Sequence, residues 1–222
     1  KMSKPQLGYW KIRGLAAAIR YQLHYSGVEF EDVLYEQGDA PDFDKQVWTD
    51  KKFNLGLDFP NLPYFVDGDF KMTESIPIHK YVADKWKPEL LGKDAQHRAT
   101  VNMIAGVVSD VKGGVTGPSY SGEKDTILKI VKDKLPAIVS FLGANKFLAG
   151  DAVTWVDFYF YELIELISFV TEGQVLKDYP TLEGYSKNFA ALPGLKEYLE
   201  SPTCLDRQVP FNNKHAKINN KP

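Results

Sequence analysis

The pattern of secondary-structure signals changes once along the chain, near residue 88, and this change constrains the fold most. Before it, short segments rich in aromatic and β-branched residues alternate with segments whose apolar residues recur at helical spacing. From residue 94 onward there is no convincing strand, only long helical segments separated by Gly and Pro. The 222 residues suffice for two modest domains. We therefore predict an α/β domain over 1–87 and an all-α domain over 92–222.

The order of elements in the first part predicts a thioredoxin-like domain. The predicted strands are 6–12, 28–35, 62–66 and 70–72, and the predicted helices are 15–25, 42–51 and 73–86. A helical crossover between the first two strands indicates a parallel pair. The turn signal Asp67-Gly68-Asp69 predicts a hairpin between the last two. This β-α-β, then β-β-α order is typical of the thioredoxin-like fold.

The second part is predicted to be helical throughout. The expected helices are 95–111, 125–142, 154–171, 181–192 and 195–200. Thr154 and Asp157 have the spacing of a capping box, in which each side chain satisfies a backbone N–H of the other. This motif belongs to folding and not to catalysis. The polar tail from Cys204 onward is expected to pack loosely or to be partly disordered.

Composition excludes several classes of function. The 27 basic and 29 acidic residues give a net charge of −2, so we expect no nucleic-acid partner, which would favour a basic stripe. No segment approaches the ~20 apolar residues needed to span a bilayer, so no membrane association is expected. The single cysteine, Cys204, allows no internal disulfide, and the first residues lack a signal-peptide pattern. A cytoplasmic location is the expectation.

No familiar hydrolase, phosphate-binding or metal motif is present. The four histidines are scattered, and none has the spacing of a metal ligand set, so no metal site is expected. Cys204 lies in the polar tail, a poor position for a buried nucleophile. If the chain is an enzyme, its nucleophile should come from a substrate.

Several blocks of the sequence resemble mu-class cytosolic glutathione transferases. These are 7–15 (LGYWKIRGL), 38–44 (GDAPDFD), 52–64 (KFNLGLDFPNLPY), 147–150 (FLAG) and 207–209 (RQV), and the third block is the most specific. The resemblance implies a thioredoxin-like domain followed by an all-α domain, assembled as a homodimer. It also implies conjugation of glutathione to electrophilic, mostly apolar substrates, a detoxification reaction. Glutathione is then a co-substrate, and no cofactor is expected.

The resemblance assigns the catalytic role to Tyr9, at the end of the first predicted strand. A thiol titrates near pH ~8.5 and a tyrosine near ~10, so the phenol stays protonated while it donates to the thiolate. The thiolate is the nucleophile, and its stabilisation raises its concentration at neutral pH. On spacing alone, a tyrosine at a strand end is more often a packing residue.

The resemblance also implies a glutathione pocket. Its residues are Trp10, Leu15, Trp48, Lys52, Asn61, Leu62, Glu74, Ser75 and Asp110. Trp48 and Lys52 lie four apart on one helical face and could hold the glycyl carboxylate. The alternative is an aromatic residue covering a loop beside a solvated lysine. In the family, Leu62 precedes a cis proline and pairs with the cysteinyl backbone of the tripeptide.

The γ-glutamyl end is expected at the start of the predicted helix 73–86. Ser75 and the free N–H groups there would receive its carboxylate. Glu74 departs from the family, which usually has glutamine, and an acid there should pair with the substrate ammonium. By resemblance, Asp110 reaches that ammonium from the neighbouring subunit.

Two further residues have roles by resemblance. Tyr120 lies in the electrophile pocket, able to donate to developing negative charge. Phe59 inserts into the partner subunit at the dimer interface, although it could also be a loop-packing residue. The segment 112–115 (KGGV) departs from the family's bulkier residues, so the shape of the pocket is not predicted.

Two alternatives belong to other classes. The first is a non-enzymatic carrier of apolar ligands, or a structural protein, on the same fold. A scaffold alone would not need the glutathione-binding residues together, which favours an enzyme. The second is a redox enzyme, which would require a cysteine near Tyr9, and none is there.

Overall fold

The structure is a computed structural model that describes residues 3–205, 209–212 and 215–219. In the described part, a four-stranded sheet has the order β2-β1-β3-β4. The strands are β1 (Gln6–Trp10), β2 (Glu31–Tyr35), β3 (Tyr64–Asp67) and β4 (Phe70–Thr73). β1 pairs parallel with β2, whereas β3 pairs antiparallel with both β1 and β4. The predicted parallel pair and hairpin are confirmed, and with them the thioredoxin-like topology.

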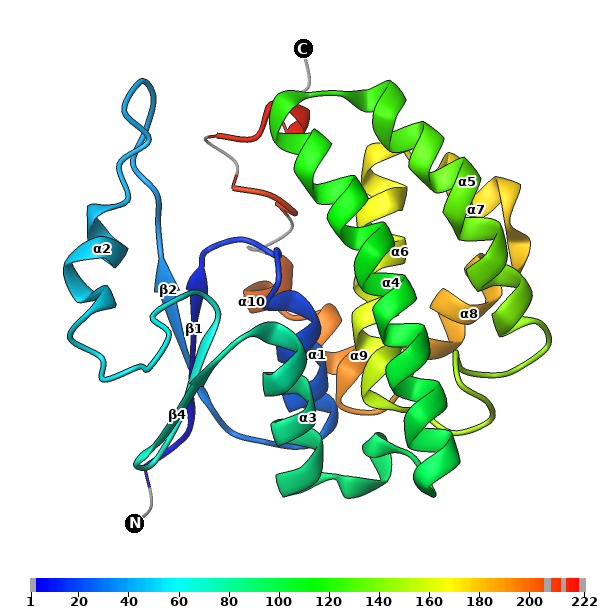
Figure 1. Cartoon of the computed structure of the whole chain (residues 1–222), viewed down its shortest axis with the longest axis horizontal. Helices are drawn as coiled ribbons and strands as arrows, with labels where there is room; N and C mark the ends of the chain where they lie inside the picture. The colour runs from blue at the N-terminus through cyan, green and yellow to red at the C-terminus, as the bar shows by residue number, and fades with distance from the viewer. Residues whose placement is uncertain (1–2, 206–208, 213–214, 220–222) are drawn as a thin grey trace.

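Three helices accompany the sheet, as predicted. α1 (Ala17–Tyr25) and α3 (Ser75–Trp86) lie between the sheet and the helical part, whereas α2 (Gln46–Lys52) lies on the opposite side (Figure 1). Leu7 and Phe65 of the sheet are fully buried and pack with Ile19 and Ile78 in one apolar core. The central strand residues are therefore buried in a core that α1 and α3 close from one side.

The second part is built around one buried helix. Its helices are η1 (Pro88–Leu91), α4 (Ala95–Ser121), α5 (Lys124–Leu142), α6 (Trp155–Val170), α7 (Gln174–Asp178), α8 (Pro180–Ala190), α9 (Leu195–Leu199), α10 (Pro202–Leu205) and η2 (Lys217–Asn219). α6 is buried on nearly every side, as an apolar helix at the centre of a bundle should be. It packs against α1 of the first part as well as α4 and α8, so it joins both halves of the chain.

α4 is longer than predicted. It continues ten residues beyond 111, through Gly113, Gly114 and Pro118, and ends at Gly122 with φ +80°. A Cβ atom at Gly114 would lie 3.0 Å from the side chain of Ile130 on α5. Glycine here permits close packing of α4 on α5 and does not end the helix, because tertiary contacts outweigh the local propensity.

The expectation for the tail was wrong in its described residues. Val209 and Pro210 accept backbone hydrogen bonds from Arg13 and Gly14 at 2.9 and 3.0 Å. Phe211 is buried. Cys204 is buried too, although the sequence places it at the start of a polar segment. Val209 and Pro210 are held in place because the loop after β1 supplies these two backbone N–H donors. Residues 207–208 of the predicted resemblance lie outside the described residues.

The predicted capping box at the start of α6 is present. Asp157 is fully buried and accepts from the Thr154 backbone N–H at 2.8 Å and from the Thr154 hydroxyl at 2.9 Å. It also accepts from the Leu148 N–H at 2.7 Å and from the Tyr185 hydroxyl at 3.0 Å. The carboxylate thus connects α6 to α8 and to the loop that precedes α6.

Asp157→Ala should therefore lower the free energy of unfolding by about 2 kcal/mol, because it removes a cap and leaves buried donors unsatisfied. Urea denaturation followed by circular dichroism measures this change. Asp151→Ala, at an exposed position six residues away, is the control and should leave the midpoint unchanged. Equal midpoints for the two variants would contradict this role of Asp157.

Candidate active site

Two neighbouring cavities lie where the first part meets the helical part. The smaller, of about 210 Å³, is lined by Tyr9, Ile12, Gly14, Leu15, Lys112, Thr116, Tyr120, Glu162, Leu166, Pro210 and Phe211. The larger, of about 480 Å³, is lined by Leu15, Glu74, Ser75, Ile76, Pro77, Ser109, Lys112, Gly113, Thr116 and Tyr159. Leu15, Lys112 and Thr116 belong to both walls, so the two cavities adjoin along these residues.

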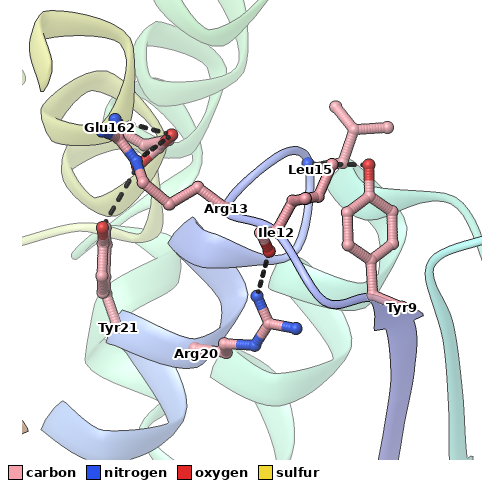
Figure 2. A network of polar contacts seen from close by, with 7 residues as sticks. All are labelled: Tyr9, Ile12, Arg13, Leu15, Arg20, Tyr21 and Glu162. Atoms are coloured by element: carbon pink, nitrogen blue, oxygen red, sulfur yellow. Dashed lines mark hydrogen bonds and ion pairs between the residues drawn. The ribbon is translucent and has the colours of Figure 1, made fainter. Parts of the chain in front are cut away.

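Tyr9 ends inside the smaller cavity, with its hydroxyl fixed by the following loop. The Leu15 backbone N–H donates to the Tyr9 hydroxyl at 3.1 Å (Figure 2). Because the oxygen accepts this bond, its own proton is left to be donated. Burial raises the pKa of Tyr9 to about 12, so the phenol stays protonated at every physiological pH.

Gly14 makes this close approach possible. Its φ is +46°, and a Cβ atom there would lie 2.6 Å from the Tyr9 hydroxyl. A side chain would therefore displace Tyr9 as well as strain the backbone. The glycine that interrupts the pattern after the first strand is required by the position of the phenol.

A buried ion pair holds the same loop against α6. The Arg13 guanidinium donates to the Glu162 carboxylate at 3.0 Å from Nη2 and 3.2 Å from Nε. The Tyr21 hydroxyl donates to the other carboxylate oxygen at 3.1 Å (Figure 2). Arg20 donates to the Ile12 carbonyl at 2.9 Å from below the loop. The loop that positions Leu15 is thus attached to α6 through Arg13 and to α1 through Arg20.

The start of α3 forms one end of the larger cavity. Glu74 precedes the helix with φ +75°, a conformation that a residue other than glycine rarely adopts. Such backbone outliers cluster at functional sites. Ser75 follows as the first helical residue, and α3 is twelve residues long, so its first N–H groups and positive dipole end face this part of the site.

This geometry, a phenol beside a helix start on a thioredoxin-like sheet, agrees with the similarity to known proteins. Residues 5–84 match the family model for the glutathione S-transferase N-terminal domain, and 118–202 match the one for the C-terminal domain. The chain belongs to the glutathione S-transferase family.

Individual relatives indicate the class within the family. The transferase is 38% identical to glutathione S-transferase Mu 1 of Bos taurus, over 90% of this chain and 92% of that protein. It is also 38% identical to the class-mu 26 kDa isozyme 1 of Fasciola hepatica, over 96% and 93%. A solved structure, the glutathione S-transferase Blo t 8, matches with a TM-score of 0.80 and 31% identity, over 90% and 93% of the two chains. These similarities place the transferase in the mu class.

The remaining predicted glutathione contacts are spread around the transferase's sheet. Trp48 is buried and stacks on Tyr64 with ring centroids 6.0 Å apart, which favours the packing alternative for its ring. Lys52 Nζ lies 5.4 Å from the ring centroid of Phe53. Trp10 meets Tyr35 edge to face. None of these predicted contacts lines either cavity.

Asn61 and Leu62 form the connection into β3. The Leu62–Pro63 peptide bond is cis, as the resemblance implied. The Leu62 N–H donates to the side-chain oxygen of Asn61 at 2.9 Å. This bond is local to the connection.

Tyr120, Asp110 and Phe59 occupy three different surroundings in the transferase. Tyr120 lines the smaller cavity with Tyr9, and its hydroxyl accepts a backbone N–H from Asn212 at 3.4 Å. Asp110 is exposed on α4 and lines neither cavity. Phe59 is 78% exposed, as its loop position indicated.

Lys112, Arg13 and Glu162 are site residues that sequence reasoning did not identify. Arg13 and Glu162 are 149 positions apart, so no local pattern connects them. Lys112 was seen only as part of the segment 112–115 that departs from the family. A lysine directly after the valine-rich segment 107–111 was the signal available for it.

Groups of acidic, histidine and cysteine residues able to hold a metal ion are absent from the part of the chain that the structure describes. Among the same residues, no helix is both long and apolar enough to cross a membrane.

Proposed function

We propose that this transferase catalyses attack of the glutathione thiolate on apolar electrophiles, with Tyr9 as the donor that stabilises the thiolate. The observation that carries this proposal is the Tyr9 hydroxyl, which accepts the Leu15 N–H and so keeps its own proton for a ligand in the cavity. The sulfur forms a bond to the electrophilic carbon, and the leaving group departs with its electron pair. Conjugation of this kind serves detoxification.

Glutathione would lie along the larger cavity with its sulfur toward Tyr9. Its γ-glutamyl carboxylate would meet Ser75 and the N-terminal N–H groups of α3, where a negative charge is favoured. Glu74 would pair with the adjacent ammonium. Trp48 and Lys52 remain the proposed contacts of the glycyl carboxylate, and Trp10, Leu15, Asn61 and Leu62 those of the middle of the tripeptide.

The electrophile would occupy the smaller cavity, beside Tyr120. Its walls are mainly apolar, with Ile12, Leu166 and Phe211 among them, which suits an apolar substrate. The Tyr120 hydroxyl could donate to an oxygen that gains negative charge as the bond forms. The site thus divides between 1–87, which would bind glutathione, and 92–222, which would bind the electrophile.

Turnover of 1-chloro-2,4-dinitrobenzene with glutathione, followed by absorbance of the conjugate, tests the function. We expect saturable turnover by the wild-type chain. The non-enzymatic alternative predicts that an apolar fluorescent ligand binds while the rate of conjugation stays at the level without protein.

We further propose a cytoplasmic homodimer. The single cysteine, which allows no internal disulfide, supports the compartment. Phe59 is 78% exposed, and Met103 and Val107 on α4 are 58% and 40% exposed. Met103 and Val107 lie four residues apart on one face of α4, and contiguous exposed apolar side chains mark interaction surfaces. Phe59 would enter the helical part of the neighbouring subunit, in a two-fold contact.

Phe59→Ala should shift the protein from dimer to monomer at micromolar concentration, because it removes the anchor of the interface. Light scattering coupled to size exclusion measures the mass. Phe53→Ala is the matched control, since Phe53 is 76% exposed in a neighbouring loop and should leave the dimer intact. A wild-type protein with the mass of a monomer would contradict the proposed homodimer.

Asp110→Ala should weaken glutathione binding by about ten- to a hundredfold, because Asp110 would hold the γ-glutamyl ammonium across the dimer by a charge-assisted hydrogen bond. Calorimetry measures the affinity. Glu74 can share this contact, so adding Glu74→Gln should enlarge the loss. Asp125→Ala, an exposed acid at the start of α5, is the control. Unchanged affinity in the Asp110→Ala, Glu74→Gln double variant would exclude the shared site.

A further inference from the structure

Lys112 of α4 is a buried cation at the junction of the two cavities. It is 4% exposed, and its side chain belongs to both cavity walls. Its Nζ has no hydrogen-bond partner among the residues that the structure describes. Its Nζ lies over the ring of Tyr159 on α6, 4.6 Å from the ring centroid. A buried ammonium is normally paired, so this arrangement calls for an explanation.

The acidic groups near Lys112 do not neutralise it. Glu162 lines the smaller cavity, but its oxygens accept from Arg13 and Tyr21, so its charge is already paired. Glu74 lines the larger cavity and is exposed at its rim. Burial lowers the pKa of Lys112 to about 8, so the ammonium form still predominates at pH 7. Among the described residues, the ammonium therefore has no acidic group hydrogen-bonded to it.

We propose that Lys112 is a specificity-determining residue, which selects electrophiles that carry an anionic group such as a carboxylate. This inference rests on the proposed function, because it places the electrophile in the smaller cavity. The apolar body of the substrate would contact Leu166 and Phe211, and its anionic group would accept hydrogen bonds from Lys112 Nζ.

The position of Lys112 supports this role over a purely structural one. A buried unpaired charge destabilises the fold, and an apolar residue of similar length would pack beside Tyr159 without that cost. An anion that enters the cavity and pairs with the ammonium offsets the desolvation of both groups. The attraction between the ammonium and an anion is stronger in the buried cavity than in water. A neutral analogue lacks this attraction, so the cavity discriminates against it.

Matched substrates test the proposal. 4-Chloro-3-nitrobenzoate and 4-chloro-3-nitrobenzamide share shape and leaving group and differ in charge. The ratio of their kcat/KM values, anionic over neutral, should fall by about ten- to a hundredfold in Lys112→Met, as loss of one charge-assisted bond predicts. Lys112→Arg keeps the charge and should retain most of the preference. Lys132→Met, at an exposed position on α5, should leave the ratio unchanged.

A binding measurement without glutathione separates this proposal from the proposed function. Calorimetry with 3-nitrobenzoate and 3-nitrobenzamide should show tighter binding of the anion by wild-type protein, and Lys112→Met should abolish that preference. If the wild-type protein does not turn over 1-chloro-2,4-dinitrobenzene but shows this preference, the proposed function fails and the anion site stands. An unchanged ratio of affinities in folded Lys112→Met, checked by circular dichroism, would overturn the proposal. So would equal losses for both ligands, which indicate a structural role.

Discussion

Tyr9→Phe should lower kcat for conjugation by roughly ten- to a thousandfold while leaving the affinity for glutathione nearly unchanged. The phenol is held by the Leu15 N–H and is buried at the end of β1, so it is already positioned before substrate binds. A donor fixed in this way stabilises the thiolate without reorganisation. Phenylalanine keeps the ring and removes only the hydroxyl.

Steady-state kinetics with 1-chloro-2,4-dinitrobenzene measures this loss, with Tyr179→Phe as the control for a tyrosine that lines neither cavity. The control should keep the wild-type rate. A Tyr9→Phe variant with the wild-type rate would remove Tyr9 from the mechanism.

Glu162→Leu should lower the free energy of unfolding by about 3–5 kcal/mol, because it leaves the Arg13 guanidinium buried without its partner. Arg13 and Glu162 are 7% and 1% exposed, and the Tyr21 hydroxyl loses its acceptor in the same variant. The loop from β1 to α1 then loses its attachment to α6. Leu15 should therefore be held less firmly, and the rate of turnover should fall.

Urea denaturation measures the loss of stability. Glu183→Leu is the comparison, since Glu183 forms a surface ion pair with Lys187 at 2.7 Å that should contribute less than about 1 kcal/mol. The double variant Arg13→Met, Glu162→Leu should be more stable than Glu162→Leu alone, because no unpaired charge remains. A double variant that is less stable than Glu162→Leu would contradict this explanation.

The sequence predicted the order of elements well, because that order depends on local patterns. Short runs rich in aromatic and branched apolar residues marked the strands, and apolar residues at helical spacing marked α1. The last ten residues of α4 were not predicted, because Gly113, Gly114 and Pro118 normally interrupt a helix. There the close contact of Gly114 with α5, which no local pattern reveals, outweighs the propensity.

The candidate site was only partly predictable. The resemblance pointed to Tyr9, and the structure adds the Leu15 N–H that fixes it and the Gly14 backbone that leaves room for it. The pairing of Arg13 with Glu162 could not be read from the sequence, since it depends on how two distant segments pack. Neither could the burial of Phe211 beside the loop after β1.

The most direct test of the central claim is the ionisation of the bound thiol. Titration of the thiolate absorbance of glutathione in complex with the transferase gives its pKa, because Tyr9, with a pKa of about 12, stays protonated across the range. The rate should rise with pH as the thiol ionises and level off above its pKa. We expect the bound thiol to titrate well below the ~8.5 of a free thiol in the wild-type complex. In Tyr9→Phe it should return close to that value. The same thiol pKa in both complexes would contradict the account.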